Sequence, residues 1–427
     1  MTGGKLVPPR AVGFWGTSLF QINGMIGSGI FALPALLVAA VGSFAPWMLL
    51  IAGVIFLPLI LVFGWLAARY DGSGGPVLYG KDAFGDFVGF QAGWGRFASG
   101  IVALAANTHV MIAYFATLFP ALETPAIEKF TIVGFFAILT MISVAGMRGS
   151  VVVLGTMTVL KLVPLAIIVL AAVFGGFAGQ PLILPQFSQA ESVILLLFYG
   201  FTGFETVTVP AGEYRDPKRD IPRVLLTVLA GVTVIYALVI WAYLTIAPTL
   251  DATENPMAAA AQVALGDWGT MLIVIAAGAS IAANNFGSVV VVPRIPFGMA
   301  QQGMLPSWFE RVSPRFLTPA NAIAFYGIGS AIMAVAGGFT LLATASTLTR
   351  MLTYVITAAA LPMLEWREGI RNPWHQLVAA LALATSIWIA SQAGVMAWIV
   401  FVGLVGLGTI LYFAAARSRQ EPAAAEA

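Results

Sequence analysis

A serine between two glycines interrupts the first apolar stretch of the chain, residues 13–40. The interruption reads Asn23-Gly24-Met25-Ile26-Gly27-Ser28-Gly29-Ile30-Phe31. Glycine costs roughly 1 kcal/mol in a helix interior, so this run predicts a helix that unwinds at its middle. The amides that open its second half, near Ser28 and Gly29, suit a carboxylate, and the carbonyls that close its first half, near Gly24 and Met25, suit an ammonium group. The pattern is therefore compatible with a site for a zwitterion such as an α-amino acid.

A second interruption lies in the stretch 189–211, which reads Leu195-Leu196-Leu197-Phe198-Tyr199-Gly200-Phe201-Thr202-Gly203-Phe204-Glu205. Two glycines and a carboxylate stand here inside an apolar run. The two interrupted stretches begin two halves of five spans each, and an odd number of spans inverts the second half relative to the first. Interrupted helices at corresponding positions of inverted halves indicate the binding site of a transporter. Close helix packing through small residues is the alternative interpretation.

The composition indicates that these stretches cross a membrane. Of 427 residues, 60% are hydrophobic and 9% are charged, and the mean hydropathy is +0.94. Soluble domains carry about 25% charged residues, so an integral membrane protein is predicted. The net charge of +2 gives no reason to expect a nucleic acid partner. The absence of cysteine excludes thiolate metal sites, and the two histidines lack ligand spacing, so neither a metal nor a cofactor is expected.

Twelve stretches of about 20 residues are long and apolar enough to span a bilayer. They lie near residues 14–40, 45–68, 94–119, 130–147, 150–176, 189–211, 223–247, 269–292, 319–337, 341–363, 375–391 and 394–415. The segment 72–93 is expected to be a connector with an interfacial helix, and 251–267 an external loop with a short helix. The predicted organisation is an N-terminus (1–12), a first inverted repeat (13–176), a second (189–363), two further spans (375–415) and a tail (416–427).

The basic residues predict the orientation of the chain. If both termini are cytoplasmic, all the lysines and arginines face the cytoplasm except Lys129, which lies outside, and Lys161 and Arg350, which lie within spans. Cytoplasmic loops of membrane proteins carry an excess of these residues, so this orientation is expected. The first stretch lacks a cleavage site and is expected to be retained.

Three motifs resemble, in order along the chain, those of the amino acid–polyamine–organocation superfamily of permeases. They are residues 24–31, residues 201–205 with the loop 213–223, and residues 293–294 with 299–306. Together with the span count, the similarity covers nearly the whole chain. The resemblance implies an all-α integral membrane protein with 12 transmembrane helices, in the leucine-transporter-type arrangement of five-plus-five inverted repeats with helices 1 and 6 broken.

The resemblance also implies roles for single residues. The substrate would contact the two breaks at Met25, Ile26, Gly27, Ser28, Gly29, Tyr199, Phe201 and Thr202. In the resembled permeases an aromatic side chain near the position of Tyr199 closes over the substrate, so Tyr199 is expected to act in gating; packing is the alternative for the aromatic residues. Glu205 matches an acidic residue that some members use in gating on the cytoplasmic side, and helix capping is its alternative.

Lys161 and Arg350 are charges inside spans that need an account. In proton-coupled relatives a lysine at the position of Lys161 stands where sodium binds in sodium-coupled ones. Burial disfavours the charged form of lysine, so Lys161 is expected to exchange a proton, and a permanently charged structural lysine is the alternative. Asn284 and Asn285 could line the same region or join helices. For Arg350 a structural use is expected, paired with an acid or with carbonyls.

An enzyme is not expected from these residues. The nucleophile elbow Gly-x-Ser-x-Gly needs glycine at the positions of Ile26 and Ile30, and the metalloprotease spacing His-Glu-x-x-His is absent. A channel is the stronger rival, but the chain contains no repeated filter sequence or charge ring.

The sequence therefore predicts a secondary active transporter of amino acids that works by alternating access, with proton coupling or exchange. The substrate is expected to be small or medium and neutral, because no acid besides Glu205 is available for a cationic side chain. A polyamine or cationic amino-acid exchanger is the alternative. The motifs and short termini indicate a multi-pass protein of a bacterial inner membrane, with an amino acid, a proton and the lipid bilayer as partners.

Overall fold

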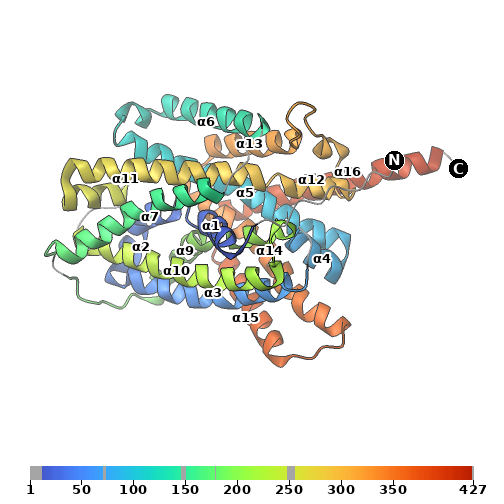
Figure 1. Cartoon of the computed structure of the whole chain (residues 1–427), viewed down its shortest axis with the longest axis horizontal. Coiled ribbons are helices and arrows are strands. Elements are labelled where there is room, and N and C mark those ends of the chain that lie inside the picture. The colour runs from blue at the N-terminus through green and yellow to red at the C-terminus, as the bar shows by residue number, and fades with distance from the viewer. Residues whose placement is uncertain (1–11, 71–73, 146–150, 178, 248–254, 426–427) are drawn as a thin grey trace.

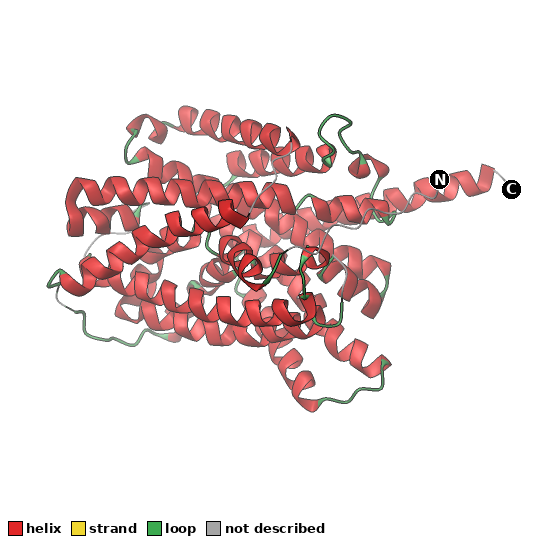
Figure 2. Ribbon diagram, in the orientation of Figure 1, coloured by secondary structure: helices red, strands yellow, loops and turns green. Residues whose placement is uncertain are grey.

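The computed structural model describes residues 12–70, 74–145, 151–177, 179–247 and 255–425. In these ranges every regular element is a helix, apart from a single β-bridge between Val12 and Tyr214 (Figure 2). In an apolar medium, backbone groups must bond within their own segment, which helices achieve. The predicted all-α class is confirmed.

The helices alternate with short connections along the chain. The α-helices are α1 (Phe14–Met25), α2 (Gly29–Val41), α3 (Ala45–Ala67), α4 (Pro76–Phe84), α5 (Asp86–Ala116), α6 (Pro125–Ala145), α7 (Val151–Phe174), α8 (Phe187–Ser192), α9 (Ile194–Phe201), α10 (Pro217–Ile246), α11 (Pro256–Val291), α12 (Arg294–Gln301), α13 (Ala320–Ala336), α14 (Phe339–Arg367), α15 (Pro373–Ser391) and α16 (Val395–Ala425). The 3₁₀ helices are η1 (Gly42–Phe44), η2 (Pro120–Glu123), η3 (Phe204–Thr208), η4 (Ala211–Glu213) and η5 (Ser307–Glu310).

Within the described residues, nine segments are long and apolar enough to cross a membrane, and two shorter apolar segments accompany them. Two of the nine join neighbouring helices, since Gly29–Ala67 contains α2 and α3 and Pro256–Gln301 contains α11 and α12. A multi-pass membrane protein is therefore supported. The count of twelve crossings and the inverted-repeat layout stay predictions.

The bundle has buried central helices and exposed peripheral ones. In the most apolar window of α5, 83% of the residues are buried, against 11% for Val395–Arg417 of α16. Helices α5 and α14 pack along each other at the centre. Figure 1 shows α6 beside α13 on one edge, α15 on the opposite edge, and the end of α16 extending beyond the bundle. The apolar surface of the peripheral helices is suited to lipid.

The predicted third span begins too late. Residues 86–93 were expected to belong to a connector, but α5 already begins at Asp86. The connector was predicted from Gly72, Gly74, Gly75 and Pro76, which weaken a helix only at the N-terminal side of that segment. Further glycines follow within residues 86–93. In the fold they permit close packing instead, since a Cβ at Gly89 would lie 2.7 Å from the backbone nitrogen of Lys81 in α4. In the expected external loop, a kink at Gly266 (φ +68°) separates a short helical stretch from the rest of α11.

Candidate functional site

The first interruption separates α1 from α2. Helix α1 ends at Met25, and α2 begins at Gly29. Ile26 departs from helical geometry (φ −81°, ψ 89°), so the helical bond pattern stops there. The N-terminus of α2 directs backbone N–H groups and partial positive charge toward the gap, as an anion site requires.

The second interruption lies between α9 and η3. Thr202 is extended, and Gly203 has a left-handed φ of +100°, which favours glycine. The two interruptions contact each other through backbone, because a Cβ on Gly203 would collide with the carbonyl of Gly24. A Cβ on Gly29 would lie 3.1 Å from the Cα of Gly200. The glycines at both breaks thus permit a close approach that side chains would prevent.

Asn107 of α5 is the polar centre between the two breaks. Its Oδ1 accepts hydrogen bonds from Ser28 Oγ at 2.5 Å and from Tyr199 OH at 2.8 Å. Its Nδ2 donates to Asn284 Oδ1 and Asn285 Oδ1, both at 3.0 Å. A side-chain amide offers two donors and two acceptor positions, so Asn107 is fully satisfied. The residue before α2 and the helices α9, α5 and α11 therefore meet at one side chain.

The carbonyls at the end of α1 also have partners. Ile26 O accepts from Lys161 Nζ at 2.9 Å, and Met25 O accepts from Tyr236 OH at 3.3 Å. Asn284 Nδ2 donates to Asn23 O at 2.6 Å. An ammonium group that bound here would share or replace these donors. Lys161 is fully buried, so its charged form depends on such contacts.

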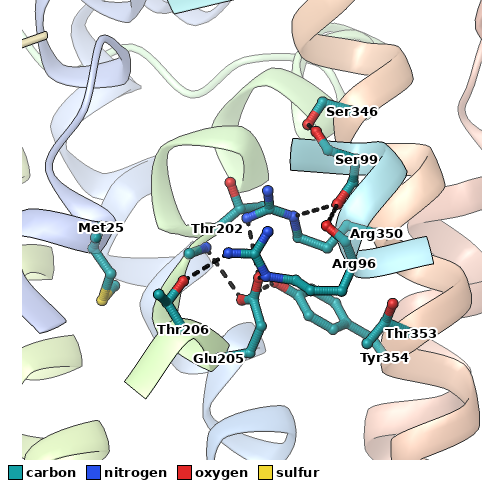
Figure 3. A network of polar contacts seen from close by, with 12 residues as sticks. Met25, Arg96, Ser99, Thr202, Glu205, Thr206, Ser346, Arg350, Thr353 and Tyr354 are labelled. Atoms are coloured by element: carbon teal, nitrogen blue, oxygen red, sulfur yellow. Dashed lines mark hydrogen bonds and ion pairs between the residues drawn. The ribbon is translucent and has the colours of Figure 1, made fainter. Parts of the chain in front are cut away.

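Glu205 follows the second break and is buried between two arginines. Its Oε1 lies 2.7 Å from Arg96 Nε and 3.2 Å from Arg350 Nη1. Its Oε2 accepts from Tyr354 OH at 2.9 Å and from the backbone N–H of Gly203 at 3.2 Å. Figure 3 shows both guanidinium groups next to the carboxylate. We call Arg96, Glu205 and Arg350 the arginine–glutamate cluster.

The cluster joins three elements, since Arg96 belongs to α5, Glu205 to η3 and Arg350 to α14. The expectation that Arg350 pairs with an acid agrees with its contact to Glu205. The bond from Gly203 N–H to Glu205 is a capping contact at the break, but the ion pairs go beyond capping.

The other residues expected at the site lie close to the breaks but point to different surroundings. Thr202 Oγ1 donates to Tyr199 O at 2.8 Å, and the sulfur of Met25 accepts from Gln21 Nε2 at 3.3 Å. The ring of Phe201 packs against Phe56 and Tyr236. A Cβ at Gly27 would lie 3.3 Å from Asn284 Oδ1. Phe201 thus contacts the aromatic core, whereas Ser28 and Tyr199 contact Asn107.

From the sequence, one of Asn107, Thr108 and His109 in the third predicted span is expected to border an external vestibule, and Arg96 has no expected role in the site. Asn107 had a usable signal, because an amide in an apolar helix needs partners. Arg96 lies near a predicted span end, where arginine is common, so its position in the sequence does not indicate burial. In the fold it is 4% exposed.

From its place near the end of a predicted span, His375 is expected to be solvated, but its side chain is only 22% exposed. Its ring stacks on Trp65 with centroids 3.9 Å apart, and Nδ1 lies 2.6 Å from Glu365 Oε1. Glu365 also pairs with Arg69 at 2.9 Å. Beside this group, burial and a hydrogen bond with Asp82 raise the pKa of Tyr70, so its hydroxyl stays neutral. The group ties α3 to α14 and α15.

The site is closed to solvent in this conformation. Ser28 is 0% exposed, and Asn107 and Tyr199 are each 6% exposed. A ligand could reach this centre only after helices move apart.

Comparison with known protein families gives one match over nearly the whole chain. A family described as amino acid permease matches residues 12–422. Uncharacterized transporters of Mycobacterium bovis and Mycobacterium tuberculosis are each 29% identical over 415 residues, which cover 94% of this chain and 90% of the relative. The serine/threonine exchanger SteT of Bacillus subtilis is 26% identical over 411 residues, covering 90% of this chain and 92% of SteT.

Proposed function

The chain belongs to the amino acid permease family, and we propose that it is a secondary active transporter of small or medium neutral amino acids that works by alternating access. The family and its transporter relatives indicate a membrane transporter rather than an enzyme. The observation that carries the finer proposal is the meeting of both helix breaks at the side chain of Asn107. A serine/threonine exchanger among the relatives supports a small polar or neutral substrate.

In the proposed complex the substrate lies between the breaks. Its carboxylate binds the first turn of α2 at Ser28 and Gly29, replacing the bond from Ser28 to Asn107. Its ammonium group binds carbonyls at the end of α1, near Met25 and Ile26. Gly27 keeps the backbone accessible, and Tyr199 with Thr202 and Phe201 forms the wall from α9. Each exchanged bond is replaced by a bond to the substrate, so binding leaves few polar groups unpaired.

Gating is assigned to Tyr199 and Glu205. The hydroxyl of Tyr199 crosses from α9 to Asn107 in α5, and rotation of this ring would open one side of the site. Glu205 ties the other side of the break to α5 and α14 through the arginine–glutamate cluster. Movement of η3 away from α5 would separate these ion pairs.

Lys161 is assigned to proton coupling. Its Nζ reaches the carbonyl of Ile26, which belongs to the first break, so the protonation state of the amine bears on the geometry of the substrate site. A neutral amine would release this contact more readily than an ammonium group. Exchange of one amino acid for another is the alternative mode of transport.

The orientation proposed is both termini in the cytoplasm of a bacterial inner membrane, as the distribution of basic residues predicts. The rival functions are a cationic amino-acid or polyamine exchanger and a channel. A thermal-shift screen of the purified protein against the twenty amino acids and common polyamines would test the substrate class. Uptake and counterflow in proteoliposomes, with and without a pH gradient, would test the mechanism. Saturable counterflow supports a carrier, and unsaturable conductance would contradict it.

A further inference from the structure

The buried charges of the arginine–glutamate cluster do not balance. Two guanidinium groups contact one carboxylate, which leaves a net charge of +1. Within the described residues the other buried carboxylate is Glu365, and it pairs with Arg69 and His375 instead. Arg96 Nη1 is also buried without a hydrogen-bond partner. An excess of positive charge is therefore held inside the bundle, where charges are screened less than at the surface.

This excess charge lies close to the proposed substrate position. Glu205 accepts from the N–H of Gly203 within the second break, and Arg350 Nε donates to Ser99 Oγ at 3.3 Å. Ser99 precedes Asn107 by eight residues of α5, which corresponds to about 12 Å along the helix axis. In Figure 3 the side chain of Arg350 extends from α14 toward the segment that carries Thr202 and Glu205.

Resting on the proposed function, we propose that Arg350 sets the charge selectivity of the substrate site. The excess positive charge rejects amino acids with a cationic side chain and admits neutral ones of the same size. For a cationic side chain bound near Asn107, about 12 Å from Ser99 along α5, repulsion by the Arg350 charge at an effective dielectric constant of about 20 corresponds to about tenfold in affinity. Arg350 is assigned the excess charge because Arg96 Nε lies closer to Glu205 Oε1, at 2.7 Å, than Arg350 Nη1 does, at 3.2 Å.

If Arg350 only stabilised the fold and did not set charge selectivity, its replacement would have a different effect. Its contacts with Ser99 and Glu205 join α14 to α5 and η3, and their loss would loosen the bundle. Such loosening would weaken the binding of neutral and cationic amino acids by the same factor. The ratio of the two affinities therefore separates charge selectivity from structural support.

The experiment compares two ligands of the same shape, L-homoserine and L-2,4-diaminobutyrate, which differ by a hydroxyl in place of an ammonium group. Dissociation constants are measured at pH 7 by ligand-induced thermal shift and by competition for uptake of labelled serine. The variants are wild type, Arg350→Gln and Arg350→Lys. Arg371→Gln is the matched control, because Arg371 is an exposed arginine outside the bundle.

The expected result is a gain of diaminobutyrate affinity, relative to homoserine, of about tenfold in Arg350→Gln. Arg350→Lys and Arg371→Gln keep the wild-type ratio. A gain of binding cannot arise from misfolding. If Arg350→Gln is unstable, Arg350→Lys tests the same point. A change in the ratio of diaminobutyrate affinity to homoserine affinity in Arg350→Lys would contradict the proposal. An unchanged ratio in Arg350→Gln also overturns it while leaving the transporter proposal intact. If no amino acid stabilises the wild type, the proposed function itself fails.

Discussion

Lys161 in α7 donates a hydrogen bond from its Nζ to the backbone carbonyl of Ile26 at 2.9 Å, and neither residue is exposed. The contact joins a titratable side chain directly to the unwound segment between α1 and α2. A change at the amine is thereby transmitted to the carbonyls proposed to bind the substrate's ammonium group.

Replacement of this amine tests proton coupling. Lys161→Ala is expected to reduce pH-gradient-driven uptake into proteoliposomes to the level of protein-free vesicles, because no group remains to carry the proton at this position. Counterflow without a gradient is expected to persist. The matched control is Lys129→Ala, which removes an exposed lysine. Full gradient-driven uptake in Lys161→Ala would rule out the coupling role.

Truncation of the polar centre tests the substrate site. Asn107→Ala removes four side-chain hydrogen bonds and leaves the groups that made them without this partner. The substitution is expected to lower the free energy of unfolding by about 2 kcal/mol or more. Amino-acid affinity is expected to fall as well, because Ser28 and Tyr199 lose their common anchor. Thermal unfolding without a ligand measures the loss of stability, and the shift on adding a neutral amino acid that stabilises the wild type measures the loss of affinity. Asn321→Ala is the control, because it removes one hydrogen bond from a side-chain amide to Trp308 O, and it should leave amino-acid affinity unchanged.

The close approach of the two breaks can be tested with a single methyl group. Gly203→Ala places a Cβ against the carbonyl of Gly24 and forces alanine into a left-handed conformation. The variant is expected to lose transport and to unfold at lower temperature. Gly231→Ala is the control, because a Cβ there meets nothing within 4 Å and alanine favours the helix α10. Equal transport by the two variants would contradict the contact.

The arginine–glutamate cluster predicts a large effect of removing its carboxylate. Glu205→Gln leaves Arg96 and Arg350 buried without a counter-charge and is expected to destabilise the fold by about 3–5 kcal/mol. Tyr354→Phe removes only the hydroxyl that donates to Glu205 and is expected to cost about 1 kcal/mol. Chemical denaturation of both variants in detergent measures the two losses in the free energy of unfolding and compares them. A loss in Glu205→Gln no greater than that in Tyr354→Phe would show that the arginines do not depend on the carboxylate.

The sequence carried enough information to locate the two helix breaks. Glycines beside a serine or a threonine inside apolar runs are costly unless the helix opens there, so Ser28 and Gly203 mark the breaks without any tertiary contact. The helical class and the membrane location also followed, because a chain with 9% charged residues cannot build a soluble surface.

The partners of the polar residues could not be derived in the same way. Asn107 meets Ser28, Tyr199 and Asn284 across 79 to 177 residues of chain, and such pairings depend on how helices rotate and cross. Arg96 of α5 contacts Glu205 of η3, and the sequence alone does not show how these two distant elements face each other. Residue types predicted where polarity is needed, and packing determined which polar groups meet.

The backbone contact between Gly24 and Gly203 has a mechanical consequence. Two unwound segments from distant parts of the chain touch without intervening side chains, so neither can be displaced toward the other. A conformational change at one break must therefore either move both segments together or open a gap between them. In both cases the change alters the two breaks at the same time.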